Sequence, residues 1–269
     1  MKVIRKVADL RNALVREPGQ GTRVGLVPTM GALHAGHLSL IAAARESCDQ
    51  VVVSLFVNPA QFGRNEDLDK YPRDEPTDIA AAEAAGVDIL FVPDAEQMYP
   101  EGFDTWIDPG KIGTFLEGTA RPGHFRGVAT ICTKLFLMVR PTRAYFGRKD
   151  AQQVAVVKQL VRDLELPVEI VACPTVRDAD GLAVSSRNVF LSPDERRAAQ
   201  ALPRALEAGL EAHRSGQDAV RAARQVLDAE PGLHVDYVAE ADLDGPTLAA
   251  AVLVGSTRLI DNVVLSSEA

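Results

Sequence analysis

The sequence is poor in cysteine and has no excess of basic charge, and each shortage excludes a class of protein. Its three cysteines, Cys48, Cys132 and Cys173, stand far apart without a CxxC pair, which argues against a disulfide framework or a structural zinc site. The formal net charge of −8 argues against a general nucleic-acid binder, because phosphate backbones require a basic surface. A local basic pocket for a small anion remains compatible with this charge.

A long apolar run is also missing. The densest one, VVVSLFV, is far too short to cross a bilayer, and the N-terminus carries no apolar stretch of the signal-peptide kind. With 269 residues, 46% of them hydrophobic, the chain can bury a sizeable core and is long enough for two domains. We therefore expect a soluble cytoplasmic protein with reduced thiols and with neither membrane nor nucleic-acid partners.

Strand-like and helix-like segments alternate through the first two thirds of the chain. Continuous apolar runs, typical of buried strands, cover residues 23–28, 50–57, 87–93, 143–147 and 167–173. This alternation predicts an α/β fold, a Rossmann-like parallel sheet covered by helices, which we place at residues 1–175. Ligands of such sheets bind beyond the carboxyl ends of the strands.

The pattern changes after Cys173. Ser192 followed by Glu195 is a capping-box pattern and predicts a helix over residues 192–213, with a second Ala/Arg-rich helix after it. Two strand-like runs, HVDYVAE and TRLIDNVVL, come last. We expect a smaller α+β C-terminal domain at residues 176–269.

The segment VPTMGALHAGH places two histidines and two glycines where a strand is expected to turn into a helix. A helix N-terminus favours phosphate, and Gly31 and Gly36 allow close approach of the backbone. His34 and His37 fall on one face of the helix, where two imidazoles could donate hydrogen bonds to a phosphate. The alternatives are a capping histidine beside a partly buried one, or a zinc pair, for which the sequence suggests no third ligand.

Three further polar clusters follow predicted strand ends or the domain junction. In FGRKDAQQ, Lys149 can neutralise phosphate charge, although Asp150 and Gln153 also fit an ordinary helix cap. In SSRN, Arg187 could grip phosphates, or the segment is a polar turn. In VNPAQF, the amide of Gln61 suits a substrate with hydroxyl and carboxylate groups. Only the convergence of these clusters predicts a phosphate-binding site.

Seven motifs occur in order and nearly from end to end: PTMGALHAGH, FVNPAQF, YPRD, RPGHFRGV, YFGRKDAQQ, GLAVSSRN and RLIDN. This series resembles the pantothenate synthetases (pantoate–β-alanine ligases), a family of the HxGH nucleotidyltransferase superfamily. The histidine motif alone indicates only the superfamily, whereas the Gln61 and Gln153 segments with RPGHFRGV make the resemblance specific. It implies condensation of (R)-pantoate with β-alanine, using ATP and Mg²⁺, to give pantothenate, AMP and diphosphate through pantoyl adenylate. It also implies a homodimer.

The resemblance implies roles for individual residues. His37 would be the proton donor. The other residues expected to stabilise the phosphate charge are His34, Lys149 and Arg187. Gln61 and Gln153 would hold pantoate, with Gln61 also reaching β-alanine and Asn58 shaping that pocket. Asp78 is the candidate metal ligand, in a stretch where relatives often carry an acidic pair and this chain has Thr77 before it. The ATP contacts would be Met30, Gly31, Ala32, Leu33, His34, Ala35, Gly36, His37, Gly147, Arg148, Lys149, Asp150, Val176, Val184, Ser185, Ser186 and Arg187.

Two other functions fit parts of the sequence. Another HxGH enzyme, acting on a phosphate instead of a carboxylate, would need a further basic site in place of the two-glutamine pocket. A nucleotide-binding protein without activity would not need the paired histidines, Lys149 and SSRN together. The polar segment GTARPGHFRG is a candidate mobile loop over the site.

Overall fold

The structure is a computed structural model that describes residues 1–14, 21–63 and 68–265, and it divides into two compact units. Unit 1 comprises Met1–Gly147 and Ala155–Cys173, and unit 2 comprises Arg148–Val154 and the chain from Pro174 onward. The short segment Arg148–Val154 thus belongs to unit 2, whereas the sequence analysis assigns it to the first domain. The carbonyl groups at its start are hydrogen-bonded by a side chain of the C-terminal sheet, which local sequence patterns do not reveal.

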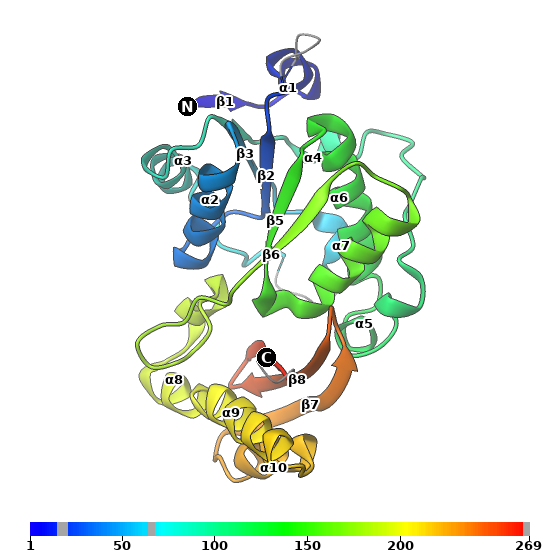
Figure 1. Ribbon diagram of the computed structural model, residues 1–269. Helices are drawn as coiled ribbons and strands as arrows, with labels where there is room; N and C mark the ends of the chain where they lie inside the picture. Colours follow the sequence, from blue (N-terminus) through cyan, green and yellow to red (C-terminus); the bar gives the residue numbers. More distant parts are fainter. Residues whose placement is uncertain (15–20, 64–67, 266–269) are drawn as a thin grey trace. The chain divides into compact units, whose positions relative to one another are not determined.

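Unit 1 is built on a parallel sheet, which within the described residues has six strands in the order β1-β4-β3-β2-β5-β6 (Figure 1). Successive connections run outward from β2 in both directions, so the strand order reverses between β2 and β5. Crevices at such switch points, beyond the carboxyl ends of the strands, are where ligands of α/β sheets bind. The strands are β1 (Lys2–Ile4), β2 (Val24–Thr29), β3 (Gln50–Leu55), β4 (Ile89–Phe91), β5 (Arg143–Gly147) and β6 (Glu169–Cys173).

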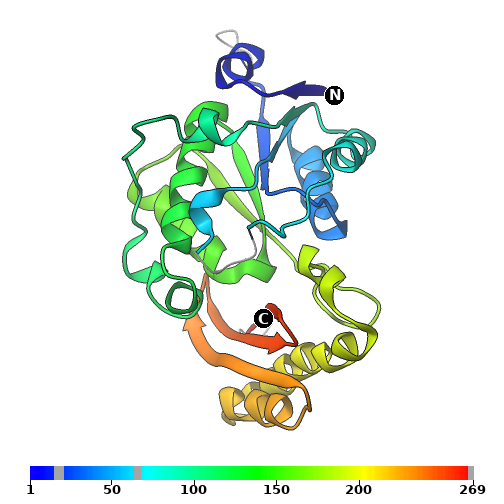
Figure 2. The same ribbon diagram turned by 180° about the vertical axis from the view of Figure 1, so that it is seen from behind.

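Helices cover both faces of this sheet, with α2 and α3 on one side and α6 on the other (Figures 1 and 2). Alternate residues of β3, such as Val51 and Val53, pack against Ile41 and Ala44 of α2. The helices are α1 (Val7–Ala13), α2 (Ala35–Ser47), α3 (Glu75–Ala84), α4 (Ala95–Met98), α5 (Glu117–Ala120), α6 (His124–Val139) and α7 (Ala151–Asp163), of which α7 begins in unit 2. Short 3₁₀ turns are η1 (Pro59–Gln61), η2 (Gly110–Gly113) and η3 (Arg148–Asp150).

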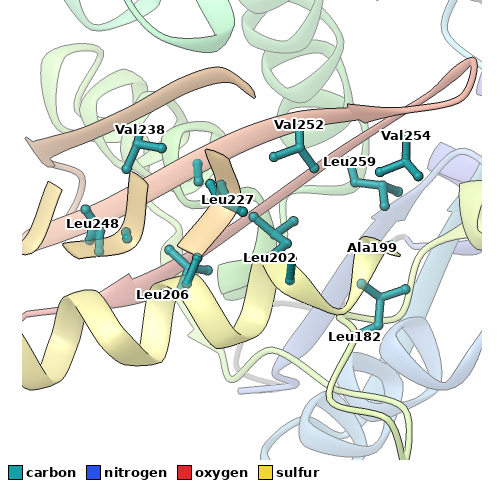
Figure 3. Packing of buried hydrophobic residues seen from close by; sticks show 14 of the residues in the cluster. Leu182, Ala199, Leu202, Leu206, Leu227, Val238, Leu248, Val252, Val254 and Leu259 are labelled. Atoms are coloured by element: carbon teal, nitrogen blue, oxygen red, sulfur yellow. The ribbon is translucent and has the colours of Figure 1, made fainter. Parts of the chain in front are cut away.

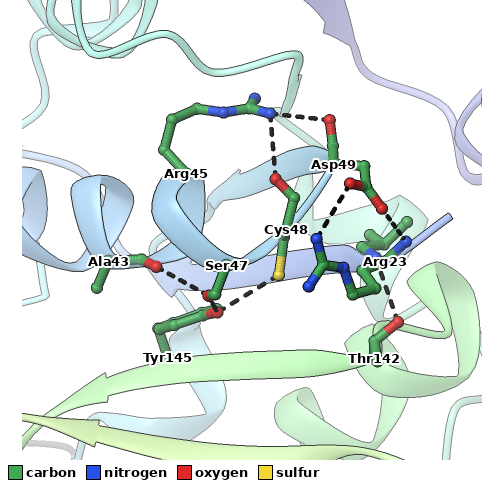
Figure 4. A network of polar contacts seen from close by, with 9 residues as sticks. Arg23, Ala43, Arg45, Ser47, Cys48, Asp49, Thr142 and Tyr145 are labelled. Atoms are coloured by element: carbon green, nitrogen blue, oxygen red, sulfur yellow. Dashed lines mark hydrogen bonds and ion pairs between the residues drawn. The ribbon is translucent and has the colours of Figure 1, made fainter.

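A polar network ties elements together at the amino edge of the sheet (Figure 4). Asp49 accepts a hydrogen bond from the Arg23 amide at 2.7 Å, and Arg45 donates to the Asp49 carbonyl at 2.8 Å. The hydroxyl of Tyr145 lies against Ser47 and the Cys48 thiol, and burial raises its pKa. Because this edge is opposite the ligand-binding edge, we interpret the network as structural.

Unit 2 combines an antiparallel sheet, β7-β8-β9, with helices that pack on it. Leu202 and Leu206 of α9 and Leu227 of α10 meet Leu248 and Val252 of β8 (Figure 3). Burying a side chain of this size contributes about 1.5–3 kcal/mol. The elements are η4 (Ser186–Phe190), α8 (Pro193–Ala199), α9 (Ala201–Arg214), α10 (Ala219–Asp228), β7 (Leu233–Asp242), β8 (Pro246–Val254) and β9 (Thr257–Val264).

The predicted fold class, a parallel α/β sheet followed by a smaller α+β part, is confirmed, but several elements differ, among them the edge strand β1, which the sequence analysis does not predict. The helix expected over residues 192–213 keeps its Ser192–Glu195 capping box but breaks at Gln200 into α8 and α9, with Pro203 in the first turn of α9. Strand β8 is absent from the sequence prediction because its central alanines have little intrinsic strand preference. They are buried there because β8 is the central strand of its sheet.

The described part of the chain contains no helix that is both long and apolar enough to cross a membrane. All three cysteines are free and buried, and burial raises the pKa of Cys132 to about 12. A thiol with so high a pKa is a poor nucleophile near neutral pH.

Candidate functional site

The two histidines of the HAGH motif form a cap at the N-terminus of α2, directly after β2. Nδ1 of His34 accepts a hydrogen bond from the Gly36 amide at 3.2 Å, and Nδ1 of His37 accepts one from the His34 amide at 3.4 Å. The two rings stack with centroids 4.0 Å apart. Gly36 permits this arrangement because a Cβ there would lie 3.0 Å from the His34 ring.

This cap also fixes which ring nitrogen carries the proton. Because Nδ1 accepts a hydrogen bond in each ring, the proton of the neutral imidazole resides on Nε2. His34 and His37 therefore each have an Nε2–H donor at a helix N-terminus, where the backbone dipole favours anions. The sequence analysis gives helix capping and phosphate binding as alternatives for these histidines. The structure shows that they are compatible, because Nδ1 forms the cap and leaves Nε2–H as a donor.

The loop that precedes the histidines has an unusual backbone, held by a distant carboxylate. Gly31 and Ala32 have φ values of +94° and +52°, and this left-handed region disfavours a residue with a Cβ, such as Ala32. Asp78 of α3 accepts hydrogen bonds from the amides of Ala32 at 3.0 Å and Leu33 at 2.6 Å. The Asp78 side chain is nearly inaccessible, with the residue 4% exposed. Asp78 therefore holds the loop that presents the histidines.

The structure gives Asp78 this loop-holding role, and metal ligation stays a prediction. Both carboxylate oxygens are engaged by backbone amides, although each retains lone pairs. Among residues 1–14, 21–63 and 68–265, no group of three or more His, Cys, Asp or Glu side chains is arranged to hold a metal ion.

Asp78→Asn tests the loop-holding role. An amide offers one acceptor atom, so one of the two partly buried N–H groups loses its partner, at a cost of up to about 1–3 kcal/mol. We expect a lower free energy of unfolding and weaker ATP binding, measured by urea titration and calorimetry. Asp74→Asn, at the exposed N-cap of the same helix, is the matched control and should change ATP binding little. Wild-type ATP affinity in Asp78→Asn would contradict the role.

Gln61, a predicted pantoate ligand, is fixed by the same loop and by a buried asparagine. Its Nε2 donates to Sδ of Met30 at 2.8 Å, and its Oε1 accepts from Nδ2 of Asn58 at 3.0 Å. Asn58, 1% exposed, also donates to the Gly127 carbonyl at 3.2 Å and accepts from the Ala60 amide and from the Tyr99 hydroxyl. The structure therefore joins the FVNPAQF motif to the HAGH loop within unit 1.

The RPGHFRGV segment supports the Gln61 backbone, a role absent from the sequence analysis. Arg121 donates to Nε2 of His124 at 3.1 Å and to the Gln61 carbonyl at 3.3 Å. Since Nε2 of His124 accepts, its Nδ1–H donates to the same carbonyl at 2.8 Å. The segment described as a loop in the sequence analysis is largely helical, in α5 and the first turn of α6. The amphipathic pattern from Val128 onward is visible in the sequence, but the earlier start of α6 is not.

The other predicted nucleotide residues belong to unit 2, except Gly147, which is the last residue of β5 in unit 1. Arg148–Asp150 form η3, where Nζ of Lys149 lies 3.5 Å from Asp150, and Gln153 is half-buried in the first turn of α7. The Val184 amide donates to the Val176 carbonyl at 2.9 Å, so these two predicted ATP contacts are neighbours. Ser185 caps η4 by accepting from the Arg187 amide at 3.3 Å.

Fold and site together define an α/β protein with a parallel sheet and an imidazole-bearing helix N-terminus at the carboxyl end of its central strand. Comparisons with known proteins specify the family. The family model for pantoate-beta-alanine ligase matches residues 2–264. The chain is 56% identical over 281 residues to the pantothenate synthetase of Roseiflexus sp. (strain RS-1), covering 99% of this chain and all of that one. The chain belongs to the pantoate–β-alanine ligase family.

Solved structures agree with this assignment. The pantothenate synthetase of Thermus thermophilus matches with a TM-score of 0.93 and 47% identity, covering 99% of this chain and 100% of that chain. The pantoate-beta-alanine ligase of Francisella tularensis, complexed with beta-gamma ATP and beta-alanine, matches with a TM-score of 0.85 and 34% identity, covering 100% of this chain and 99% of that one. The resemblance stated from the sequence motifs is thereby confirmed.

Proposed function

We propose that this protein condenses (R)-pantoate with β-alanine at the expense of ATP, giving pantothenate, AMP and diphosphate through a pantoyl-adenylate intermediate. The proposal rests on one loop of unit 1, which connects the residue proposed to bind the acyl substrate with the histidines proposed to bind phosphate. Met30 contacts Gln61 at one end of this loop, and His34 and His37 form the helix cap at the other. An acyl substrate held by Gln61 and a phosphate at the cap would be bound by one short stretch of chain.

In the first step, a carboxylate oxygen of pantoate attacks the α-phosphorus of ATP. A bond forms between these atoms while the bond from the α-phosphorus to the bridging oxygen breaks, and diphosphate leaves. The Nε2–H groups of His34 and His37 donate hydrogen bonds to the phosphate oxygens as charge shifts onto them. Because Nδ1 of His37 accepts from the His34 amide, we propose that His37 acts as a hydrogen-bond donor that keeps its Nε2 proton, and not as the proton donor that the resemblance implies. Mg²⁺ bound to ATP would offset the charge of the phosphates, and Asp78 is the residue proposed to hold it.

In the second step, the amine of β-alanine attacks the activated carbonyl. The carbon–oxygen bond to the phosphate breaks, AMP leaves, and the attacking nitrogen loses a proton. Gln61 and Gln153 hold the pantoate part through amide donors and acceptors, and Gln61 also orients β-alanine. Asn58 acts through Gln61, whose Oε1 it binds.

The remaining proposed nucleotide contacts are Gly147, the last residue of β5, and residues of unit 2. Lys149 and Arg187 neutralise phosphate charge, and Lys149 lies in the η3 turn between Arg148 and Asp150. Val176 and the segment Val184–Ser186 contact the nucleoside part. The hydrogen bond between Val176 and Val184 supports a shared contact surface for these two residues.

Exchange of labelled diphosphate into ATP, with Mg²⁺ and without β-alanine, tests the proposal. We expect exchange only when (R)-pantoate is present, because the adenylate must form before diphosphate can re-enter ATP. Exchange without pantoate, or exchange supported only by another carboxylic acid, would contradict the proposed acyl substrate.

We further infer that the protein works as a homodimer in the cytoplasm. Three free, buried thiols support a reducing compartment. The charge of −8 supports small-molecule substrates over nucleic acid. Sedimentation at micromolar concentration tests the dimer, and a monomer mass would contradict it.

A further inference from the structure

The RLIDN motif of β9 has no role in the functional proposal, yet two of its side chains are buried and polar. Asp261 is 2% exposed and Asn262 is 8% exposed. Buried polar side chains are costly unless their hydrogen bonds are satisfied, so the partners of these two residues indicate what they do.

Asn262 forms hydrogen bonds with the backbone at Lys149. Its single Nδ2 group donates to the Arg148 carbonyl at 2.8 Å and to the Lys149 carbonyl at 2.9 Å. Two consecutive carbonyls bound by one amide leave η3 little freedom to rotate relative to β9. Arg148 is fixed again through its side chain, which donates to Asp244 at 3.1 Å.

Asp261 holds a second segment of unit 2, the turn from Val176 to Val184. Its carboxylate accepts from both terminal nitrogens of Arg177, at 2.6 and 3.1 Å, and from the Asn262 amide at 2.8 Å. The Asp261 side chain is fully buried, which strengthens such a bidentate pair. Arg177 lies next to Val176 and pairs with Ala183 across the turn.

We propose that Asp261 and Asn262 are positioning residues that hold the two nucleotide-binding segments of unit 2, residues 148–150 and 176–184, in a fixed geometry. The inference rests on the proposed function for the identity of these segments. In this proposal, Asp261 and Asn262 act through the segments that they hold and not through a contact of their own with the substrate. Adjacent residues of a strand point to opposite faces of the sheet. Asp261 and Asn262 can therefore each bind a different segment.

Asn262→Asp and Asn262→Ala test the proposal through the affinity for ATP. Aspartate is nearly isosteric but presents an oxygen to the two carbonyls, and alanine removes the donors without repulsion. We expect the ATP dissociation constant, measured by calorimetry without pantoate, to rise about tenfold or more from the loss of two hydrogen bonds. Amide exchange at residues 148–150 should also become faster.

Thr247→Val is the matched control, because Thr247 is a buried polar residue of the same sheet whose hydroxyl donates to the Gly245 carbonyl at 2.9 Å. It should lower the melting temperature but leave ATP affinity unchanged. Unchanged affinity in both Asn262 variants, or an equal loss in Thr247→Val, would overturn the proposal. This test measures ATP binding without pantoate, so it does not depend on the proposed reaction. If the wild-type protein shows no pantoate-dependent exchange, the proposed reaction is refuted but the positioning role is not.

Discussion

Replacing His37 with alanine is expected to slow pantoyl-adenylate formation by about 10²–10³-fold, the range typical of a lost hydrogen-bond donor to developing charge. Single-turnover release of diphosphate with pantoate and ATP, in the absence of β-alanine, measures this rate. The fold should persist, because the hydrogen bond that the His37 ring accepts from the His34 amide is long, at 3.4 Å. The rate falls because the Nε2–H donor, which the cap orients, is removed.

The variant His37→Asn distinguishes the loss of the Nε2–H donor from the loss of the helix cap. In His37→Asn, the side-chain oxygen can take the place of Nδ1 and accept from the His34 amide, but no group replaces Nε2–H. We expect this variant to be as slow as His37→Ala. Wild-type rates in His37→Asn would show that capping alone matters. His213→Ala, at an exposed position near the end of α9, controls for the loss of a histidine and should be fully active.

Replacing Gly127 with alanine is expected to damage both stability and substrate binding. A Cβ at this position of α6 would lie 2.3 Å from the Ala60 carbonyl oxygen and 2.7 Å from the Gln61 amide nitrogen. Both are backbone atoms, so α6 or η1 must move, at a cost of about 1–3 kcal/mol or more. The shift also displaces Gln61, so the KM for pantoate should rise with the loss of stability.

Thermal unfolding and steady-state kinetics measure the two effects. Gly21→Ala is the control, because a Cβ there meets nothing within 4 Å and should change neither quantity. A Gly127→Ala protein with wild-type melting temperature and pantoate KM would mean that α6 and η1 are not held in the close contact described here.

Local sequence patterns are sufficient for most of the fold. The apolar runs predict the inner strands of the parallel sheet, since buried parallel strands need apolar residues on both faces. The Ser192–Glu195 pattern locates a helix start correctly. The family, inferred from seven ordered motifs, is confirmed. The alanine-rich strand β8 escapes prediction, because only its central place in the sheet makes those residues strand-forming.

What the sequence by itself determined is local: strand and helix periodicity, the caps, and the types of side chain offered for phosphate and carboxylate binding. What only the tertiary structure decided is which distant groups hold them. Asp78 binds the Ala32 amide across 46 residues, and Asn262 binds the Arg148 carbonyl across 114. Short-range patterns carry no record of such partners, because hydrogen bonds between remote segments depend on how the chain has folded, not on spacing along it.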